Sequence, residues 1–127
     1  MINRRVISED EARKAIELGE FPESIRTSQS RVAIILTQNW CPQWRSMKRW
    51  LKKVEKNGVD DGTDIDIYEL EYNGKPFGKE FMRFKESVLG NDLVPYVRYY
   101  RNGEFIGDSN FVSRDRFFAL LNGDSST

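Results

Sequence analysis

Two apolar runs on either side of one amphipathic helix constrain the fold of this chain more than any other feature. Residues 32–36 read Val-Ala-Ile-Ile-Leu, a continuous run typical of a strand buried on both faces. A helix is predicted from Pro42 to Asn57, because apolar side chains recur there at helical spacing: Met47, Trp50, Leu51 and Val54. Residues 65–70 carry Ile65 and Ile67 in alternation, which predicts a second core strand. A strand–helix–strand unit of this kind requires a parallel pair of strands.

The rest of the chain adds further helices and an antiparallel hairpin. Ser8 and Glu11 have the spacing of a capping box, which predicts a helix from about Glu9 to Leu18. We expect a loop over 21–30, an acidic turn over 60–64, a helix within 77–90, a hairpin around Asn102-Gly103 and a helix over 113–121. The sequence therefore predicts an α/β chain, a single domain over 1–127. Its central mixed sheet of four to five strands is flanked by helices on both faces, and residues 122–127 form a disordered tail.

Composition limits the chemistry open to the chain. One cysteine and no histidine exclude an intramolecular disulfide, a histidine–cysteine metal site and an imidazole base within one chain, so no metal and no resident cofactor are expected. The formal net charge of zero argues against nucleic acid as a partner. No apolar run is long enough to span a membrane. Acidic residues come before any apolar run at the N-terminus, so we expect that this segment is not a signal peptide. We expect a cytoplasmic monomer.

Three motifs in order along the chain resemble the thioredoxin family. A buried strand leads into Trp40-Cys41-Pro42, and a helix begins there. Val94-Pro95 opens a later strand, and Asn102-Gly103 joins the last two strand-like runs. The resemblance covers nearly the whole chain. It implies a thioredoxin-like fold, a nucleophilic thiol at Cys41 and a cis-proline at Pro95 opposite that thiol.

The chain departs from the family pattern at the redox site. The family's resolving cysteine lies three residues after the nucleophile, and Trp44 stands at that position. Ile35 stands where thioredoxins carry a buried acid. Pro42 directly after the thiol is closer to the Cys-Pro start of glutaredoxins. A dithiol cycle that resolves itself is therefore excluded.

A thiol at a helix N-terminus faces unpaired N–H groups and the positive end of the helix dipole, which favour the thiolate. Arg45 and Lys48 follow in the same helix and would add favourable charge. Without a second cysteine, Cys41 would form a mixed disulfide with a protein or small-molecule disulfide, until an external low-molecular-weight thiol resolves it. The resemblance implies that Trp40, Pro42, Trp44, Val94 and Pro95 contact the substrate.

Several alternatives remain open from the sequence. Cys41 is alternatively a buried small hydrophobe, and Trp44 alternatively extends the apolar stripe of Met47 and Leu51. The first function predicted is a monothiol thiol–disulfide oxidoreductase. The second is a non-catalytic thioredoxin-fold module that binds peptides. The third is a cluster carrier shared between two chains, which the bulky Trp44 fits poorly.

Overall fold

The computed structural model describes residues 1–58 and 62–123. Its elements are, in chain order, β1 (Ile2–Val6), α1 (Glu9–Leu18), α2 (Glu23–Arg26), β2 (Arg31–Thr37), α3 (Pro42–Asn57), β3 (Ile65–Glu71), α4 (Gly78–Ser87), β4 (Tyr96–Arg101), β5 (Glu104–Ser109) and α5 (Arg114–Leu121). Two boundaries matter most for function: β2 ends four residues before Cys41, and β4 begins directly after Pro95.

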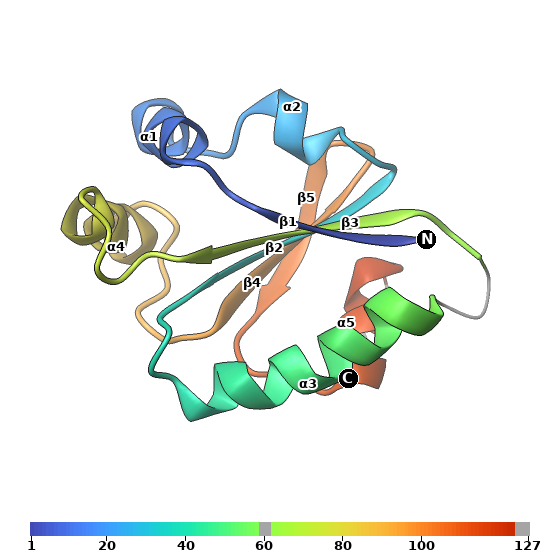
Figure 1. Ribbon diagram of the computed structural model, residues 1–127. Helices are drawn as coiled ribbons and strands as arrows, with labels where there is room; N and C mark the ends of the chain where they lie inside the picture. The colour runs from blue at the N-terminus through green and yellow to red at the C-terminus, as the bar shows by residue number, and fades with distance from the viewer. Residues whose placement is uncertain (59–61, 124–127) are drawn as a thin grey trace.

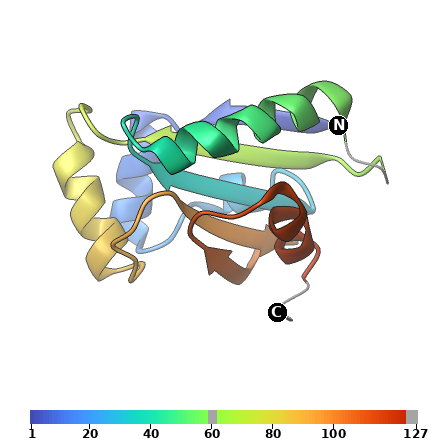
Figure 2. The same cartoon turned by 90° about the horizontal axis from the view of Figure 1, so that it is seen from below.

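The strands form one mixed sheet in the order β1-β3-β2-β4-β5. β1 and β2 both run parallel to β3, whereas β4 runs antiparallel to both β2 and β5. Helices α1, α2 and α4 lie on one side of the sheet, and α3 and α5 lie on the other (Figure 1). Seen from below, α3 and α5 lie in front of the strands (Figure 2). The α/β class, the mixed sheet and the helices on both faces are confirmed.

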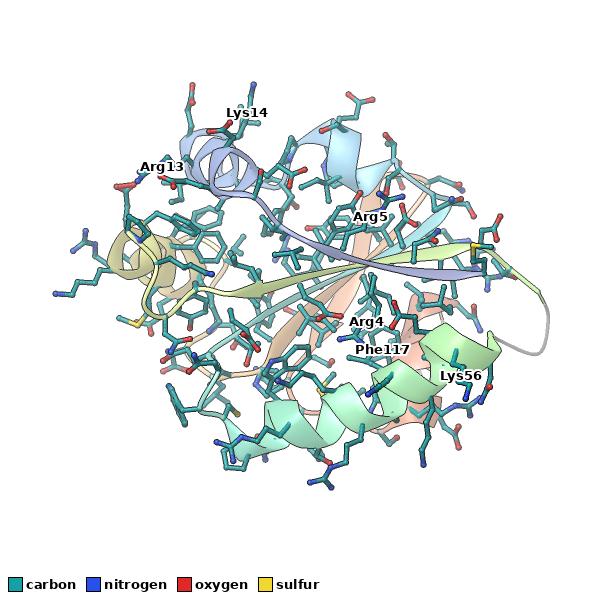
Figure 3. All side chains as sticks on the ribbon, in the orientation of Figure 1. Arg4, Arg5, Arg13, Lys14, Lys56 and Phe117 are labelled. Carbon is teal, nitrogen blue, oxygen red and sulfur yellow. The ribbon has the colours of Figure 1, made fainter. Side chains whose placement is uncertain are left out.

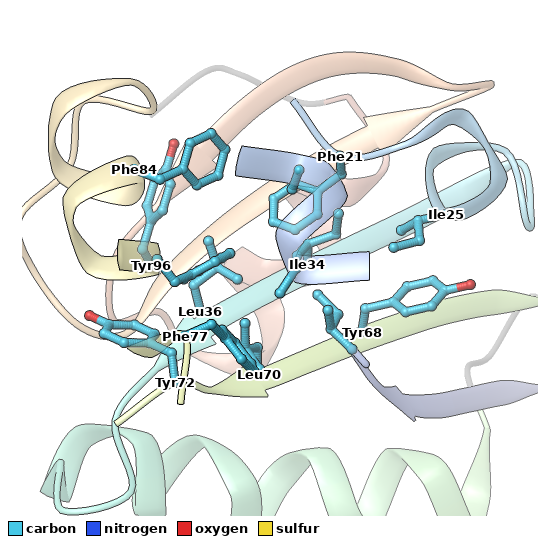
Figure 4. Packing of buried hydrophobic residues seen from close by; sticks show 14 of the residues in the cluster. Phe21, Ile25, Ile34, Leu36, Tyr68, Leu70, Tyr72, Phe77, Phe84 and Tyr96 are labelled. Atoms are coloured by element: carbon cyan, nitrogen blue, oxygen red, sulfur yellow. The ribbon is translucent and has the colours of Figure 1, made fainter. Parts of the chain in front are cut away.

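The central position of β2 explains its continuous apolar sequence. Residues 32–37 are all buried, because alternate side chains enter two separate cores. Ile34 and Leu36 pack under α1, α2 and α4 in the first core, together with Phe21 and Tyr96 (Figure 4). Ala33 and Ile35 enter the second core, whose other members include Trp44, Met47 and Phe117. The same strand therefore supports both layers of helices.

The strand β1, at one edge of the sheet, was not predicted from the sequence. Its pairing with β3 sets Ile2 beside Ile65 and Val6 beside Glu69, and only Ile2 of the strand is buried. Arg4 points to the α3 side, where its guanidinium donates to Glu69 and to Glu55 of α3 (3.4 Å) (Figure 3). An edge strand held by ion pairs lacks the apolar pattern by which a strand is found in a sequence.

Two other expectations need correction. The expected loop over 21–30 contains the short helix α2, whose Ile25 is buried in the first core. Asn122 and Gly123 still belong to the hydrogen-bonded end of α5, because their N–H groups donate to the Phe118 and Leu120 carbonyls (3.0 Å each). The expected tail therefore does not begin at residue 122, and residues 124–127 lie outside the described part of the chain. So do residues 60 and 61 of the expected acidic turn.

Local signals at the ends of elements are borne out. The capping box is complete: the Glu11 N–H donates to the Ser8 hydroxyl (3.1 Å), and the Ser8 N–H donates to the Glu11 carboxylate (2.9 Å). Ser113 caps α5 in the same way through the Arg116 N–H (3.2 Å). In the β4–β5 turn both Asn102 (φ 51°) and its following glycine adopt positive φ, as the Asn-Gly pair predicts.

Candidate functional site

Cys41 lies at the junction between β2 and α3, where the chain turns before the helix begins. Its N–H donates to the Gln38 carbonyl (3.2 Å), which closes the turn, and its own carbonyl accepts from the Arg45 N–H (3.1 Å) as the helix starts. Pro42 occupies the first helical position, where no N–H donor is needed. The Cys41 side chain makes no capping bond to α3 and is 4% exposed.

The residues just before β4 lie opposite the thiol. β2 and β4 are antiparallel neighbours with Leu36 beside Tyr96, so the end of β2 and the start of β4 meet at one edge of the sheet. The Val94–Pro95 peptide bond is cis, and the Cys41 Sγ donates to the Val94 carbonyl (3.7 Å). The sheet thus brings together two predicted site segments that are more than fifty residues apart.

The turn before Cys41 is held by side-chain amides. Asn39 and Asn73 are joined twice, because the Asn39 N–H donates to the Asn73 amide oxygen and the Asn73 amide donates to the Asn39 side chain (2.8 Å each). Gln38 accepts from the Trp40 indole N–H (2.6 Å) and donates to the Tyr72 hydroxyl (3.3 Å). These bonds fix the Trp40 indole and the Cys41 backbone against the turn that follows β3.

A groove of about 420 Å³ opens beside the thiol. Its lining combines the Cys41 turn, the start of α3, the residue after β3, the end of α4 and the loop before β4: Gln38, Trp40, Cys41, Pro42, Gln43, Tyr72, Glu86, Asp92, Leu93 and Val94. Trp40 is 54% exposed and Leu93 58% exposed, so two large apolar side chains are available to a ligand. A neighbouring hollow of about 370 Å³ shares Gln38 and Tyr72 with this groove. Burial raises the pKa of Tyr72 above its usual value, and the hydrogen bond from Gln38 opposes this rise.

Trp44, which stands at the resolving position, is a core residue. It is 1% exposed, its indole N–H donates to the Glu71 carboxylate (2.7 Å), and Lys48 lies over its ring (5.5 Å). The prediction that Trp44 contacts substrate is therefore wrong, because its ring has no surface to offer. The alternative interpretation holds, in which Trp44 extends the stripe of Met47 and Leu51.

The other predicted site residues differ in accessibility. Pro42 is exposed and lines the groove, Val94 is half-buried and lines it as well, and Pro95 is buried behind them. Ile35 is fully buried in the same core as Cys41, at the position where the resemblance implies an acid.

The two basic residues expected to favour the thiolate have other partners. The Lys48 ammonium pairs with the Glu71 carboxylate (3.5 Å), and the Arg45 guanidinium donates to the Trp40 carbonyl (3.4 Å). Their charge is therefore directed toward an acid and toward the Trp40 backbone. The sequence alone did not identify Glu71 as the partner of Lys48, because Glu71 belongs to β3 and Lys48 to α3.

The described residues contain no group of three or more acidic or cysteine side chains placed to hold a metal ion. Within that same part of the chain, no helix combines the length and apolarity that crossing a membrane requires.

Comparison with known proteins identifies the architecture. No protein-family model matches the sequence, and no curated protein sequence matches it. Solved structures do match. Thioredoxin O1 from Arabidopsis thaliana in the oxidized state has a TM-score of 0.64 at 13% identity, covering 94% of this chain and 96% of that one. The chain has the thioredoxin fold. The chain is also similar to thioredoxin f2 from Chlamydomonas reinhardtii, with a TM-score of 0.61 at 16% identity, covering 98% of this chain and 97% of that one. The short form of spinach chloroplast thioredoxin F has a TM-score of 0.62 at 14% identity, covering 98% of this chain and 95% of that one.

Six residues of the groove were not among the predicted site residues: Gln38, Gln43, Tyr72, Glu86, Asp92 and Leu93. Gln38 and Gln43 flank the Trp40-Cys41-Pro42 motif, whereas the other four come from the position after β3, the last turn of α4 and the loop before Val94, and no motif marks any of these four. The only available signal was the position of residues 92 and 93 immediately before the Val94-Pro95 pair.

Proposed function

We propose that this chain is a monothiol thiol–disulfide oxidoreductase that forms mixed disulfides through Cys41 and takes part in thiol–disulfide homeostasis in the cytoplasm. The observation that carries the proposal is the placement of Cys41. It lies at the start of α3, 3.7 Å from the Val94 carbonyl, in the wall of a groove with exposed apolar residues. The groove gives a disulfide a place to bind next to the Cys41 sulfur.

The first chemical step is attack on a bound disulfide. The Cys41 thiol loses its proton to solvent and releases the Val94 carbonyl, because a thiolate has no proton to donate. The thiolate then forms a new S–S bond with one sulfur of the substrate, the substrate's own S–S bond breaks, and the other sulfur leaves as a thiolate. The backbone beside Pro95 supports this step by pairing with an extended substrate peptide.

The second step needs a thiol from outside. No other cysteine is present in the sequence, so the mixed disulfide on Cys41 persists until a low-molecular-weight thiolate attacks it. That attack regenerates the Cys41 thiolate and leaves the external thiol in a new disulfide. The attack falls on the sulfur that Cys41 took from the substrate, so each cycle consumes one small thiol, which ends in the new disulfide, and no bound cofactor is required. The proposed enzyme works as a monomer.

The burial of the thiol favours a second candidate, a peptide-binding module without turnover. Cys41 is 4% exposed and hydrogen-bonded to Val94, which fits a small packing residue as well as a nucleophile. In this candidate Trp40 and the backbone before Pro95 hold an extended peptide and no bond forms. Reactivity of the thiol in the folded protein separates the two candidates.

In the deciding experiment, the reduced protein is mixed with a model protein whose single cysteine is capped with glutathione. Intact-mass spectrometry then measures transfer of the glutathionyl group. We expect a glutathionyl adduct on the folded protein, formed faster than free glutathione removes the same cap. The Cys41→Ser variant should form none, and its far-UV circular dichroism should match the wild type. An adduct of equal yield on Cys41→Ser, or no adduct on the wild type, would contradict the oxidoreductase and favour the binding module.

A further inference from the structure

From the charges that line the groove, we infer that it selects disulfides whose cysteine is flanked by arginine or lysine, with Glu86 and Asp92 as the residues that set this preference. The inference rests on the proposed function, because it names the substrate class for the Cys41 groove. The occupant is an extended peptide, with its cysteine at Cys41 and a basic side chain toward the two carboxylates.

Every charged side chain that lines the groove is acidic. Among its lining residues, Glu86 and Asp92 are the only ones that carry a charge at neutral pH in addition to any thiolate at Cys41. Both are exposed, and neither forms an ion pair or hydrogen bond through its carboxylate within residues 1–58 and 62–123. Glu86 lies in the last turn of α4, where the helix dipole is also negative.

The ammonium of Lys85, the residue before Glu86, does not cancel this preference. Lys85 is fully buried, its ammonium donates to the Asn91 carbonyl (2.8 Å), and it lies over the Tyr96 ring (5.7 Å). Burial lowers the pKa of Lys85, and the charges of Glu86 and Asp92 oppose that shift. The Lys85 ammonium therefore reduces the negative potential of the groove, but it is buried and cannot contact a ligand. The carboxylates of Glu86 and Asp92 line the groove and can.

The apolar part of the groove suits the same occupant. Trp40 and Leu93 are both largely exposed at its wall. The methylene stem of a lysine or arginine covers apolar surface well while its charged end reaches a carboxylate, and a guanidinium also stacks on an indole face. A volume of about 420 Å³ lies within the range of ligand pockets and is enough for the cysteine and one flanking side chain.

The test uses three short peptides of the form X-Cys-X, with X being arginine, glutamine or glutamate, each activated as a pyridyl disulfide. Cys41 attacks the peptide sulfur and releases 2-thiopyridone, whose absorbance gives the rate. The rate of each peptide with N-acetylcysteine is measured as well, because it corrects for the peptide's own reactivity. Serine versions of the peptides, which cannot react, are titrated against the protein by NMR. This second measurement reports recognition even if Cys41 proves unreactive.

We expect the corrected rate for the arginine peptide to exceed that for the glutamate peptide about five-fold at low salt. This corresponds to roughly 1 kcal/mol, the upper range for an exposed ion pair. The ratio should fall toward one in 1 M salt, where charges are screened beyond about 3 Å. It should also fall toward one in the double variant Glu86→Gln/Asp92→Asn. The matched variant Glu17→Gln/Glu104→Gln removes two acids outside the groove lining and should keep the ratio.

The outcomes separate this inference from the proposed function. Equal corrected rates for the three peptides, together with equal binding of their serine versions, would overturn the charge preference while leaving the oxidoreductase standing. No reaction with any peptide, but tighter binding of the arginine version, would support the preference and contradict the oxidoreductase. Loss of the ratio in the Glu17/Glu104 control as well as in the groove variant would also overturn the inference, because net charge alone would then explain it.

Discussion

Replacing Trp44 by cysteine tests how the resolving position is used. The change would supply the missing second thiol, three residues after Cys41, but it would also empty a packed site. Trp44 is 1% exposed and packs within the second core with Met47 and Leu51. Truncating a buried Trp or Phe to alanine costs about 3–5 kcal/mol. Cysteine fills part of the space, so we expect the reduced Trp44→Cys variant to lose about 3 kcal/mol of unfolding free energy.

Oxidation of the variant should return part of this loss. A disulfide between residues 41 and 44 closes a loop of four residues, and the chain-entropy relation gives about 2 kcal/mol for a loop of that size. The oxidised variant is therefore expected to lie about 1 kcal/mol below the wild type. The measurement is urea unfolding followed by circular dichroism, with and without dithiothreitol. Trp44→Ser is the matched control, because it leaves a similar space and should not respond to oxidation.

Two results would refute this reasoning. A reduced Trp44→Cys variant as stable as the wild type would show that the indole does not support the core. An oxidised variant no more stable than the reduced one would show that residues 41 and 44 do not pair. The same proteins also test the monothiol limit in the reduction of insulin by dithiothreitol. The wild type should catalyse it weakly or not at all, and the oxidisable variant should catalyse it better.

Three further predictions concern the fold around the site. Arg98 is 7% exposed, and its guanidinium donates to two tyrosine hydroxyls and a glutamate. The Arg98→Met variant should therefore lose about 3 kcal/mol of unfolding free energy in urea, and a loss below about 1 kcal/mol would contradict this expectation. Gly78→Ala would place a Cβ against the Tyr72 carbonyl oxygen, closer than normal van der Waals contact. The melting temperature of this variant should fall by several degrees, as for a clash of about 1–3 kcal/mol, and an unchanged value would argue against the close approach. Burial raises the pKa of Tyr96 to about 12, so the folded state keeps that proton above pH 10 while the unfolded state loses it. Burial also raises the pKa values of Tyr99 and Tyr100. The unfolding free energy should therefore fall as pH rises from 10 to 12, and tyrosinate absorbance at 295 nm should rise together with unfolding. Ionisation of these phenols before the protein unfolds would contradict this.

Much of the fold was predictable because its signals are local. The apolar run of β2, the stripe of α3, the Ser8 capping box and the Asn102-Gly103 turn each report on a few neighbouring residues. The edge strand β1 was missed because its stability comes from Arg4 pairing with Glu69, more than sixty residues away. A sequence pattern cannot show a partner at that distance.

The candidate site was predictable only in part. Cys41 and Pro95 were found because short motifs mark them, and the antiparallel pairing of β2 with β4 brings them together. Glu86 and Asp92 were missed, because only the packing of α4 against the sheet places them beside the thiol. Glu86 and Asp92, which we infer set the substrate preference, are therefore harder to identify from the sequence than Cys41, which we propose reacts with the substrate.

Trp44 does more than occupy the place of a second thiol. Its indole N–H and the Lys48 ammonium both contact one oxygen of the Glu71 carboxylate, so the first two turns of α3 are tied to the end of β3. The chain between β2 and α3 is tied to the next turn by the Asn39–Asn73 pair. Cys41 lies between these two attachments, and its backbone therefore has little freedom to move. A cysteine at position 44 could not donate to Glu71 as the indole does, so a chain with a second thiol there would keep only the Lys48 ion pair between the start of α3 and Glu71.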